Sequence, residues 1–413
     1  MGKQVRIVDI AVEDRRFQLE AGEGVDSVHN TGVYSYAVCV LLTDCPGISG
    51  TGLSFALGRG TNLVCEAVRD LAQPLVGREI HELMAEYGRV FESITEMPDY
   101  RWLGPRKGVV HLAAASITNS CFDLWAKAEE KPLWRLLLDL SPEQLTATMN
   151  FRYVEDLLSE EEALAMLCRE RESRERRLKI LDTGYTGYDT SVGWFDYSDE
   201  LIVRNAKEAA EKGFRAMKLK IGGKDFERDI RRAFLVREAV GDDVRIMLDA
   251  NQQWTLKQAI HMANRMAEMN PYFIEEPTDP DDVLAHQTLS RAVAPVKIAT
   301  GEHVPNKTMF KNYLQQQAIS FCQIDALRVG GVSEYLLISM MAKKCHIPVL
   351  SHVGDMGQLH QHLVLADHIV IGHPADFLEN IPHLAQYFKY PAVIENGVYR
   401  IPEEPGSSCD FIS

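Results

Sequence analysis

The sequence lacks several features, and each absence excludes a class of protein. None of its eight cysteines forms a Cys-x-x-Cys pair, which argues against a structural zinc site and is typical of reduced cysteines in a cytosolic protein. No apolar run approaches the about 18 residues that a membrane-spanning helix needs. The N-terminal stretch MGKQVRIVDI has no apolar core of a secretory signal. We therefore expect a cytoplasmic protein that does not enter a membrane.

Positive charge is also scarce. The 413 residues carry 59 acidic and 44 basic side chains, a formal net charge of −15, so nucleic acid and anionic membranes are not expected partners. The most basic run, RERESRERR, interleaves glutamates with its arginines, which is typical of a solvated helix face. An acidic protein can still hold a small anion in a locally basic or metal-bearing pocket, and we expect a small-molecule partner.

The order of the predicted elements divides the chain into two domains. Residues 1–140 mix a strand pattern at 34–43 with helical patterns at 61–76 and 109–130, which predicts an α+β domain. Residues 141–385 form the second domain, and residues 386–413 are expected to return to the first. A chain of this length is long enough for two such units.

From about residue 184, short apolar strands alternate with helix-length segments. The predicted strands cover residues 188–194, 215–221, 244–249, 271–276, 296–300, 321–325, 347–352 and 368–372. Such βα alternation predicts an α/β fold with a parallel sheet, closed as a TIM-type barrel. The last helix is hard to find, so we expect a modified (β/α)7β barrel.

Charged side chains stand where these strands end. They are Lys218 and Lys220, Asp249, Glu275 and Glu276, Glu302, Asp325 and His352. From Asp249 to His352 the intervals between successive strand ends are 26, 27, 23 and 27 residues, each about one βα unit. Because barrel enzymes carry their chemistry at the C-terminal ends of the strands, we expect these groups to meet at one rim.

The carboxylates of Asp249, Glu275 and Glu302 are expected to bind a metal. Three such anions repel each other when left unpaired, and an all-oxygen ligand set favours Mg²⁺. Each carboxylate taken alone fits a simpler role, as the cap of the next helix or the partner of an arginine. Three consecutive strands that end in this way favour the metal.

Lys218 and Lys220 lie two positions apart, so they face the same side of their strand. A solvated edge strand would explain them without any chemistry. Beside a metal, they suit a reaction that removes the α-proton of a carboxylate and forms an enediolate. Lys220, with a pKa lowered by its neighbours, is the expected base, and Lys218 the expected electrostatic partner.

Asp325 and His352 are expected to form a dyad across the barrel mouth from the lysines. The carboxylate would fix the imidazole tautomer and leave the other ring nitrogen free to transfer a proton. A single histidine is more often structural, and we interpret His286, His303, His346, His360 and His362 as structural or surface residues.

Together these residues resemble the enolase superfamily, in its mandelate racemase subgroup. The matching motifs are KLK at 218–220, LDAN at 248–251, IEEP at 274–277, TGEH at 300–303, QID at 323–325 and SH at 351–352. RWLGPRKGVVHLA at 101–113 and NFRYVEDLL at 150–158 resemble the L-fuconate dehydratases most closely. The resemblance covers nearly the whole chain.

The resemblance implies a capping domain over a modified barrel, one Mg²⁺, dehydration of acid sugars and a homo-oligomer. It implies that Asp249, Glu275 and Glu302 hold the metal, that Lys220 takes the α-proton, and that His352, oriented by Asp325, protonates the departing hydroxyl. The residues it places near the substrate are Lys218, Gly24, Val25, Asp26, Tyr34, Asn251 and Glu379.

Three segments differ from the L-fuconate dehydratases where the sugar tail is expected to lie. They are the first loop, GEHVPNK at 301–307, and VGDMGQLHQHL at 353–363, where that family has a small-residue stretch. Three hypotheses stay open: an acid-sugar dehydratase, a racemase or epimerase that uses the same residues, and a non-catalytic scaffold.

Overall fold

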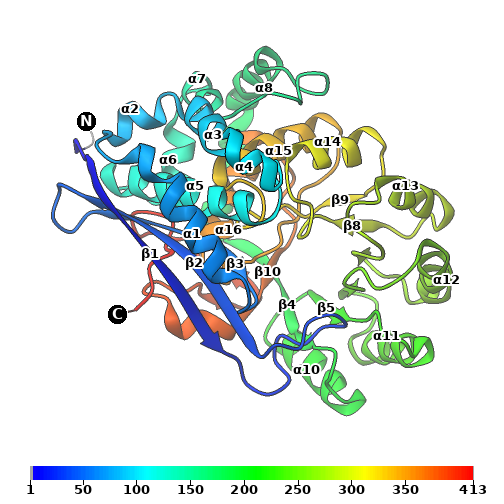
Figure 1. Ribbon diagram of the computed structural model, residues 1–413. Helices are drawn as coiled ribbons and strands as arrows, with labels where there is room; N and C mark the ends of the chain where they lie inside the picture. Colours follow the sequence, from blue (N-terminus) through cyan, green and yellow to red (C-terminus); the bar gives the residue numbers. More distant parts are fainter. Residues whose placement is uncertain (1–2, 413) are drawn as a thin grey trace.

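The computed structural model describes residues 3–412, and two β-sheets organise the chain (Figure 1). The first sheet is antiparallel, in the order β1 (Ile7–Gln18), β2 (Val33–Thr43) and β3 (Ser49–Ala56). Its central strand is apolar on both faces, as the aromatic and β-branched residues of 34–43 predict.

Helices follow this sheet, and the longest of them packs on it. They are α1 (Thr61–Leu71), η1 (Gln73–Leu75), α2 (Ile80–Met84), α3 (Tyr87–Thr95), α4 (Pro98–Leu103), α5 (Gly108–Ala128), α6 (Leu133–Asp139) and α7 (Pro142–Ala147). The helix α5 is buried along most of its length and packs on β2 and β3. The Ser116 hydroxyl donates to the Gly52 carbonyl at 3.0 Å, which shows how closely the helix and strand approach.

Glycine at position 52 is required by this approach. A Cβ there would lie 2.1 Å from the Ser116 carbonyl oxygen, which is backbone and cannot move aside. We expect Gly52→Ala to lower the free energy of unfolding by about 3 kcal/mol, the upper end for overpacking a core. Gly47→Ala is the control: its site is open, and only the positive φ of 81° opposes a side chain, at about 1 kcal/mol. Equal denaturation midpoints for the two variants would contradict this prediction.

The second sheet is largely parallel. The strands β4 (Tyr185–Gly193), β5 (Ala216–Lys220), β6 (Arg245–Asp249), β7 (Phe273–Glu275), β8 (Ile298–Thr300) and β9 (Phe321–Cys322) pair in chain order. On the other side of β4 lie β10 (Leu378–Asn380), which is parallel, and β12 (Val398–Tyr399), which is antiparallel and pairs with β11 (Ile394–Glu395). The register sets Lys220 opposite Asp249, and Asp249 opposite Glu275.

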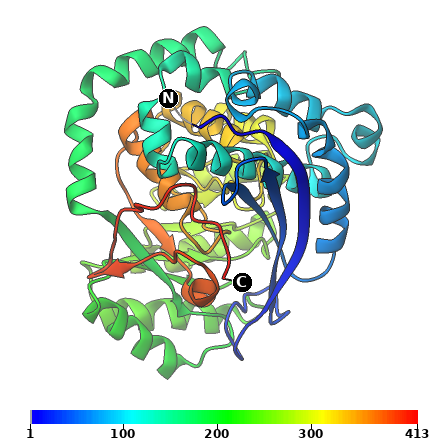
Figure 2. The same ribbon diagram turned by 90° about the vertical axis from the view of Figure 1, so that its left-hand side faces the viewer.

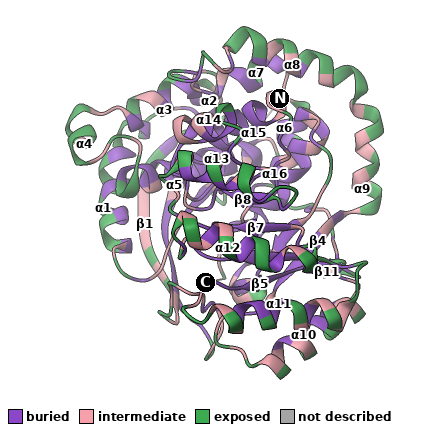
Figure 3. Cartoon of the chain, turned by 90° about the vertical axis from the view of Figure 1, so that its right-hand side faces the viewer, coloured by how far each residue is buried: buried purple, intermediate pink, exposed green. Residues whose placement is uncertain are grey.

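Helices alternate with these strands, which confirms the predicted α/β fold with a parallel sheet. They are α8 (Glu160–Ser173), η2 (Arg174–Lys179), α9 (Ile180–Thr183), α10 (Asp199–Glu211), α11 (Phe226–Val240), α12 (Leu256–Met266), η3 (Ala267–Met269), α13 (Val283–Ala292), α14 (Lys307–Gln315), α15 (Val332–Lys344), α16 (Leu359–Ala366), η4 (Asp367–Ile371) and η5 (Pro382–Tyr387). Exposed residues lie on outer helices such as α10–α12 (Figure 3), whereas α15 and α16 are buried along almost their whole length. Within residues 3–412, no helix combines the length and apolar character needed to cross a membrane.

Two predicted strands differ in the structure. Residues 368–372 are not a strand: η4 is a π-helix that continues α16, and the last parallel strand is β10. The Asp367 carboxylate accepts hydrogen bonds from Tyr335 and Ser339, both on α15, which ties this segment to a helix. A short apolar run carries no periodicity that separates a strand from a buried helix. The predicted strand at 347–352 is reduced to a parallel bridge between Val349 and Cys322.

Two segments join the sheets. The loop after β1 reaches the second sheet, where the Phe195 amide donates to the Val25 carbonyl at 2.9 Å and the Ser27 hydroxyl to the Ala250 carbonyl at 3.3 Å (Figure 1). The C-terminal segment lies beside the first sheet (Figure 2), where the rings of Phe411 and Phe17 are 5.2 Å apart. The loop after β1 thereby lies over the C-terminal ends of the parallel strands.

Candidate active site

A cavity of about 310 Å³ lies between this loop and the C-terminal ends of the parallel strands. Of the residues singled out from the sequence, eight line it: Gly24, Asp26, Tyr34, Lys220, Glu302, Asp325, His352 and Glu379. They come from seven separate segments of the chain, so the fold gathers them at one place.

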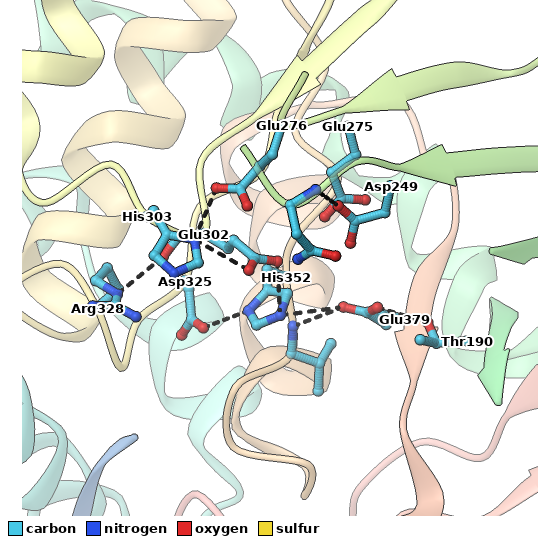
Figure 4. A network of polar contacts seen from close by, with 12 residues as sticks. Thr190, Asp249, Glu275, Glu276, Glu302, His303, Asp325, Arg328, His352 and Glu379 are labelled. Atoms are coloured by element: carbon cyan, nitrogen blue, oxygen red, sulfur yellow. Dashed lines mark hydrogen bonds and ion pairs between the residues drawn. The ribbon is translucent and has the colours of Figure 1, made fainter. Parts of the chain in front are cut away.

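The three expected metal ligands lie together, and Glu302 alone of the three lines the cavity. Asp249, Glu275 and Glu302 each offer an oxygen atom, and these atoms lie within 4.8 Å of one another. All three side chains are buried. Figure 4 shows Glu302 between His303 and His352, with Asp249 and Glu275 on the neighbouring strands. The strand register produces this cluster, because β6 and β7 end at the same level.

The pKa values of Glu275 and Glu302 are shifted in opposite directions. Burial raises the pKa of Glu275 to about 8, against the opposing effect of Lys218. Burial also acts to raise the pKa of Glu302, but His352 and His303 outweigh it and hold that pKa well below its usual range. Glu302 Oε2 is buried without a hydrogen bond from any described residue, although His352 Nε2 lies 3.2 Å away. Crowded, incompletely paired carboxylate oxygens are the ligand chemistry of a hard divalent cation.

Lys218 is buried beneath the cavity and does not line it. Its Nζ lies 2.6 Å from Glu379 Oε1 and 3.2 Å from both carboxylate oxygens of Glu275. Burial acts to lower the pKa of Lys218, but Glu275 and Glu379 outweigh it, so the ammonium form is favoured. Lys218 therefore serves as a fixed positive charge under the carboxylates.

Lys220 lines the cavity and is paired with one of the expected ligands. Its Nζ lies 2.6 Å from Asp249 Oδ2 and 5.6 Å from the centre of the Trp194 ring. Burial and Lys218 both act to lower the Lys220 pKa, as expected from the sequence, but Asp249 outweighs them and the pKa is raised. Lys218 thus acts in the predicted direction, and the further lowering expected from a bound metal stays a prediction.

His352 and Asp325 form the expected dyad. His352 Nδ1 lies 2.7 Å from Asp325 Oδ2, and Nε2 lies 3.8 Å from Glu379 Oε2. Burial acts to lower the His352 pKa, but Glu302 and Asp325 raise it to about 9. Since Nδ1 is engaged by Asp325, the ring presents Nε2 on the carboxylate side of the cavity.

The expected substrate-binding residues divide into two groups. Asp26 and Tyr34 line the cavity from the first sheet's side; Asp26 Oδ1 accepts the Val28 and His29 amides at 2.7 and 2.6 Å, which shapes the loop. Val25 and Asn251 are buried and do not line the cavity. The backbone N–H of Asn251 instead donates to Asp249 Oδ1 at 3.0 Å, so it fixes an expected ligand.

Several cavity residues were missed from the sequence. They are His29, Thr190, Trp194, His303 and Arg328. The assignment of His303 as merely structural does not fit its place: it lines the cavity, with Nδ1 2.9 Å from Glu276 Oε1, and Glu276 outweighs burial to raise its pKa to about 10. His29, His303 and Arg328 each follow a predicted site residue within three positions, and that proximity was the available signal.

Comparisons with known proteins agree with this geometry. Residues 201–411 match the family described as Enolase C-terminal domain-like. The chain is 41% identical to Mitochondrial enolase superfamily member 1 of Xenopus laevis, over 98% of this chain and 93% of that one. It is 38% identical to L-galactonate dehydratase of Hypocrea jecorina, over 99% and 92%. The crystal structure of human Mitochondrial enolase superfamily member 1 superposes with a TM-score of 0.95 at 38% identity, covering 99% of this chain and 95% of that one.

Proposed function

Since the chain belongs to the enolase superfamily, we propose that it is a Mg²⁺-dependent acid-sugar dehydratase, a hydro-lyase. The observation that carries the proposal is a cavity lined by a lysine, an aspartate-supported histidine and Glu302, which belongs to a cluster of three carboxylates. The substrate class is an aldonate, for which the name of the L-galactonate dehydratase relative and the resemblance to L-fuconate dehydratases are the support.

The donor set fits the metal. Asp249, Glu275 and Glu302 would hold Mg²⁺, because their oxygens converge within 4.8 Å and Glu302 Oε2 is buried without a hydrogen bond from any described residue. When bound, Mg²⁺ would offset the negative charge that develops on the substrate carboxylate and draw the Asp249 charge away from Lys220.

Lys220 takes the α-proton. Its Nζ reaches the cavity, and the Trp194 ring and the buried strand beneath restrict its side chain. Removal of the proton beside a carboxylate leaves an enediolate. The Lys218 ammonium, fixed by Glu275 and Glu379, contributes a permanent positive charge beneath that carboxylate.

His352 delivers a proton to the leaving β-hydroxyl. Asp325 holds Nδ1–H, so Nε2 is the atom that carries the transferred proton. The C–O bond breaks as water departs. The resulting enol takes up a proton at C3, its C2 hydroxyl loses one, and the product is a 2-keto-3-deoxy acid. The overall change is the loss of one water molecule.

We extend the proposal to the architecture. A buried cluster takes one residue from each strand in turn, Tyr188, Ala216, Met247, Phe273, Ala299 and Phe321, together with Leu350. Such a layer of inward-facing side chains supports a closed (β/α)7β barrel. Among residues 3–412, the segment 348–350 is not joined to β10 by strand pairing. We also propose a capping domain of residues 1–140 with 386–413, a catalytic domain of 141–385, a homo-oligomer and a cytoplasmic location.

The test is a screen of the purified protein with Mg²⁺ against aldonates and aldarates, with 2-keto acid detected by semicarbazide. We expect product from L-galactonate, L-fuconate or a close stereoisomer, and its loss when EDTA removes the metal. Exchange of the α-proton in D₂O without dehydration would instead favour the epimerase. If the protein catalysed neither reaction with any acid sugar, that result would contradict the proposal and favour a scaffold.

A further inference from the structure

A second histidine continues the Asp325–His352 dyad into the protein interior. His360 Nε2 lies 3.3 Å from Asp325 Oδ1, the oxygen that His352 does not use, and 2.9 Å from the Ala326 amide nitrogen; a protonated Nε2 donates to the carboxylate. Asp325 Oδ1 also accepts the Leu327 amide at 2.7 Å. Its Nδ1 donates to Asp355 Oδ1. His360 and Asp355 are fully buried. The four side chains therefore form one row, from the cavity into the core.

The loop that carries Asp355 is held on both sides. Asp355 Oδ2 accepts the Gly357 and Leu359 amides at 3.0 and 2.9 Å, which ties the carboxylate to the start of α16. From β2, the Tyr36 hydroxyl lies 3.1 Å from the Gly354 carbonyl and 3.0 Å from the Asp355 carbonyl, close enough to donate to either. Asp355 thus presents a fixed acceptor to His360.

The same loop packs directly against Asp325. A Cβ at Gly354 would lie 2.4 Å from Asp325 Oδ2, so the loop backbone lies close to the oxygen that His352 engages. This segment, VGDMGQLHQHL, is also one of the three that differ from the L-fuconate dehydratases.

We propose that His360, anchored by Asp355, is a positioning residue that holds Asp325 in the orientation required by His352. By donating Nε2–H to Asp325 Oδ1, beside the Leu327 amide that the same oxygen accepts, it leaves Oδ2 for His352 Nδ1–H. Without it, the carboxylate can rotate or admit water, and His352 loses its fixed tautomer. The catalytic meaning of the dyad rests on the proposed function, but the positioning itself does not.

The first experiment is independent of any substrate. In protein labelled with ¹⁵N-histidine, the His352 Nδ1–H proton is assigned by its loss in His352→Gln, and its exchange with water is measured. We expect His360→Ala to accelerate this exchange about tenfold or more. His360→Gln, which keeps an amide able to face Asp325 and Ala326, should recover part of the protection and serves if the alanine variant fails to fold.

His362→Ala is the matched control. His362 is equally buried on the same helix, but its Nδ1 accepts the Trp134 amide at 3.2 Å, away from the dyad. It should leave the His352 proton unchanged. The proposal would be overturned if the His352 Nδ1–H proton kept its protection against exchange in both His360 variants, or lost it equally in His362→Ala. An unprotected proton in the wild-type protein would also overturn it.

The second experiment uses the acid sugar that the wild-type protein dehydrates. His360→Ala should lower kcat for dehydration about 10- to 100-fold, with KM and Lys220-dependent α-proton exchange in D₂O nearly unchanged. An equal fall of both reactions would mean a general structural role and would overturn the proposal. If the wild-type protein dehydrates no acid sugar, the proposed function fails, and the measurement on His352 still decides the positioning role.

Discussion

Lys220→Met is expected to lower the rate of acid-sugar dehydration by about 10³- to 10⁴-fold. Methionine keeps the length and apolar stem of the side chain, so the cavity and the contact with Trp194 are preserved while the base is removed. The α-proton then has no acceptor, and exchange of that proton in D₂O should fall by the same factor. Both rates are measured with Mg²⁺ present, on the acid sugar identified in the screen.

Lys224→Met is the control for this variant. Lys224 is exposed and lies four residues further along the chain, beyond the end of β5. Its replacement should leave both rates unchanged. Equal α-proton exchange in Lys220→Met and in the wild-type protein would show that another group removes the proton, and the assignment of Lys220 would be wrong.

His352→Gln is expected to separate the two halves of the reaction. Dehydration should fall by about 10²- to 10⁴-fold because the leaving hydroxyl loses its proton donor. Exchange of the α-proton should persist, because Lys220 and its partner Asp249 are untouched. Glutamine keeps a polar group near Asp325 and so limits the free-energy cost of leaving that buried carboxylate without its hydrogen-bond partner. The measurement compares 2-keto acid formation with deuterium incorporation into recovered substrate.

His346→Gln controls for a general effect of losing an imidazole, since His346 is exposed at the end of α15. It should resemble the wild-type protein in both assays. If His352→Gln abolished exchange as completely as dehydration, His352 would be required for the first proton transfer as well. That result would contradict the division of labour between lysine and histidine.

The sequence predicted those features of the site that depend on patterns within short segments. The spacing of Lys220, Asp249 and Glu275 follows from the length of a βα unit and the alternation of side chains along a strand, and both are properties of short segments. The register of the parallel strands then sets these residues side by side.

The misassigned features depend on neighbours that are distant in sequence. The segment predicted as a strand is the π-helix η4 (Asp367–Ile371), and its first residue, Asp367, is bound by two hydroxyls from α15. His303 is a cavity residue because Glu276 on another strand holds it there. No periodicity or motif encodes such contacts.

The sequence by itself determined the fold class, the order of the parallel strands and the identity of the charged groups at their ends, because apolar periodicity and strand spacing are local. Only the tertiary structure decided which of those groups face the cavity, that Lys218 and Asn251 lie beneath it, and that Asp325 is backed by His360 and Asp355. Those outcomes depend on through-space distances and on burial, which arise when segments far apart in the chain pack together.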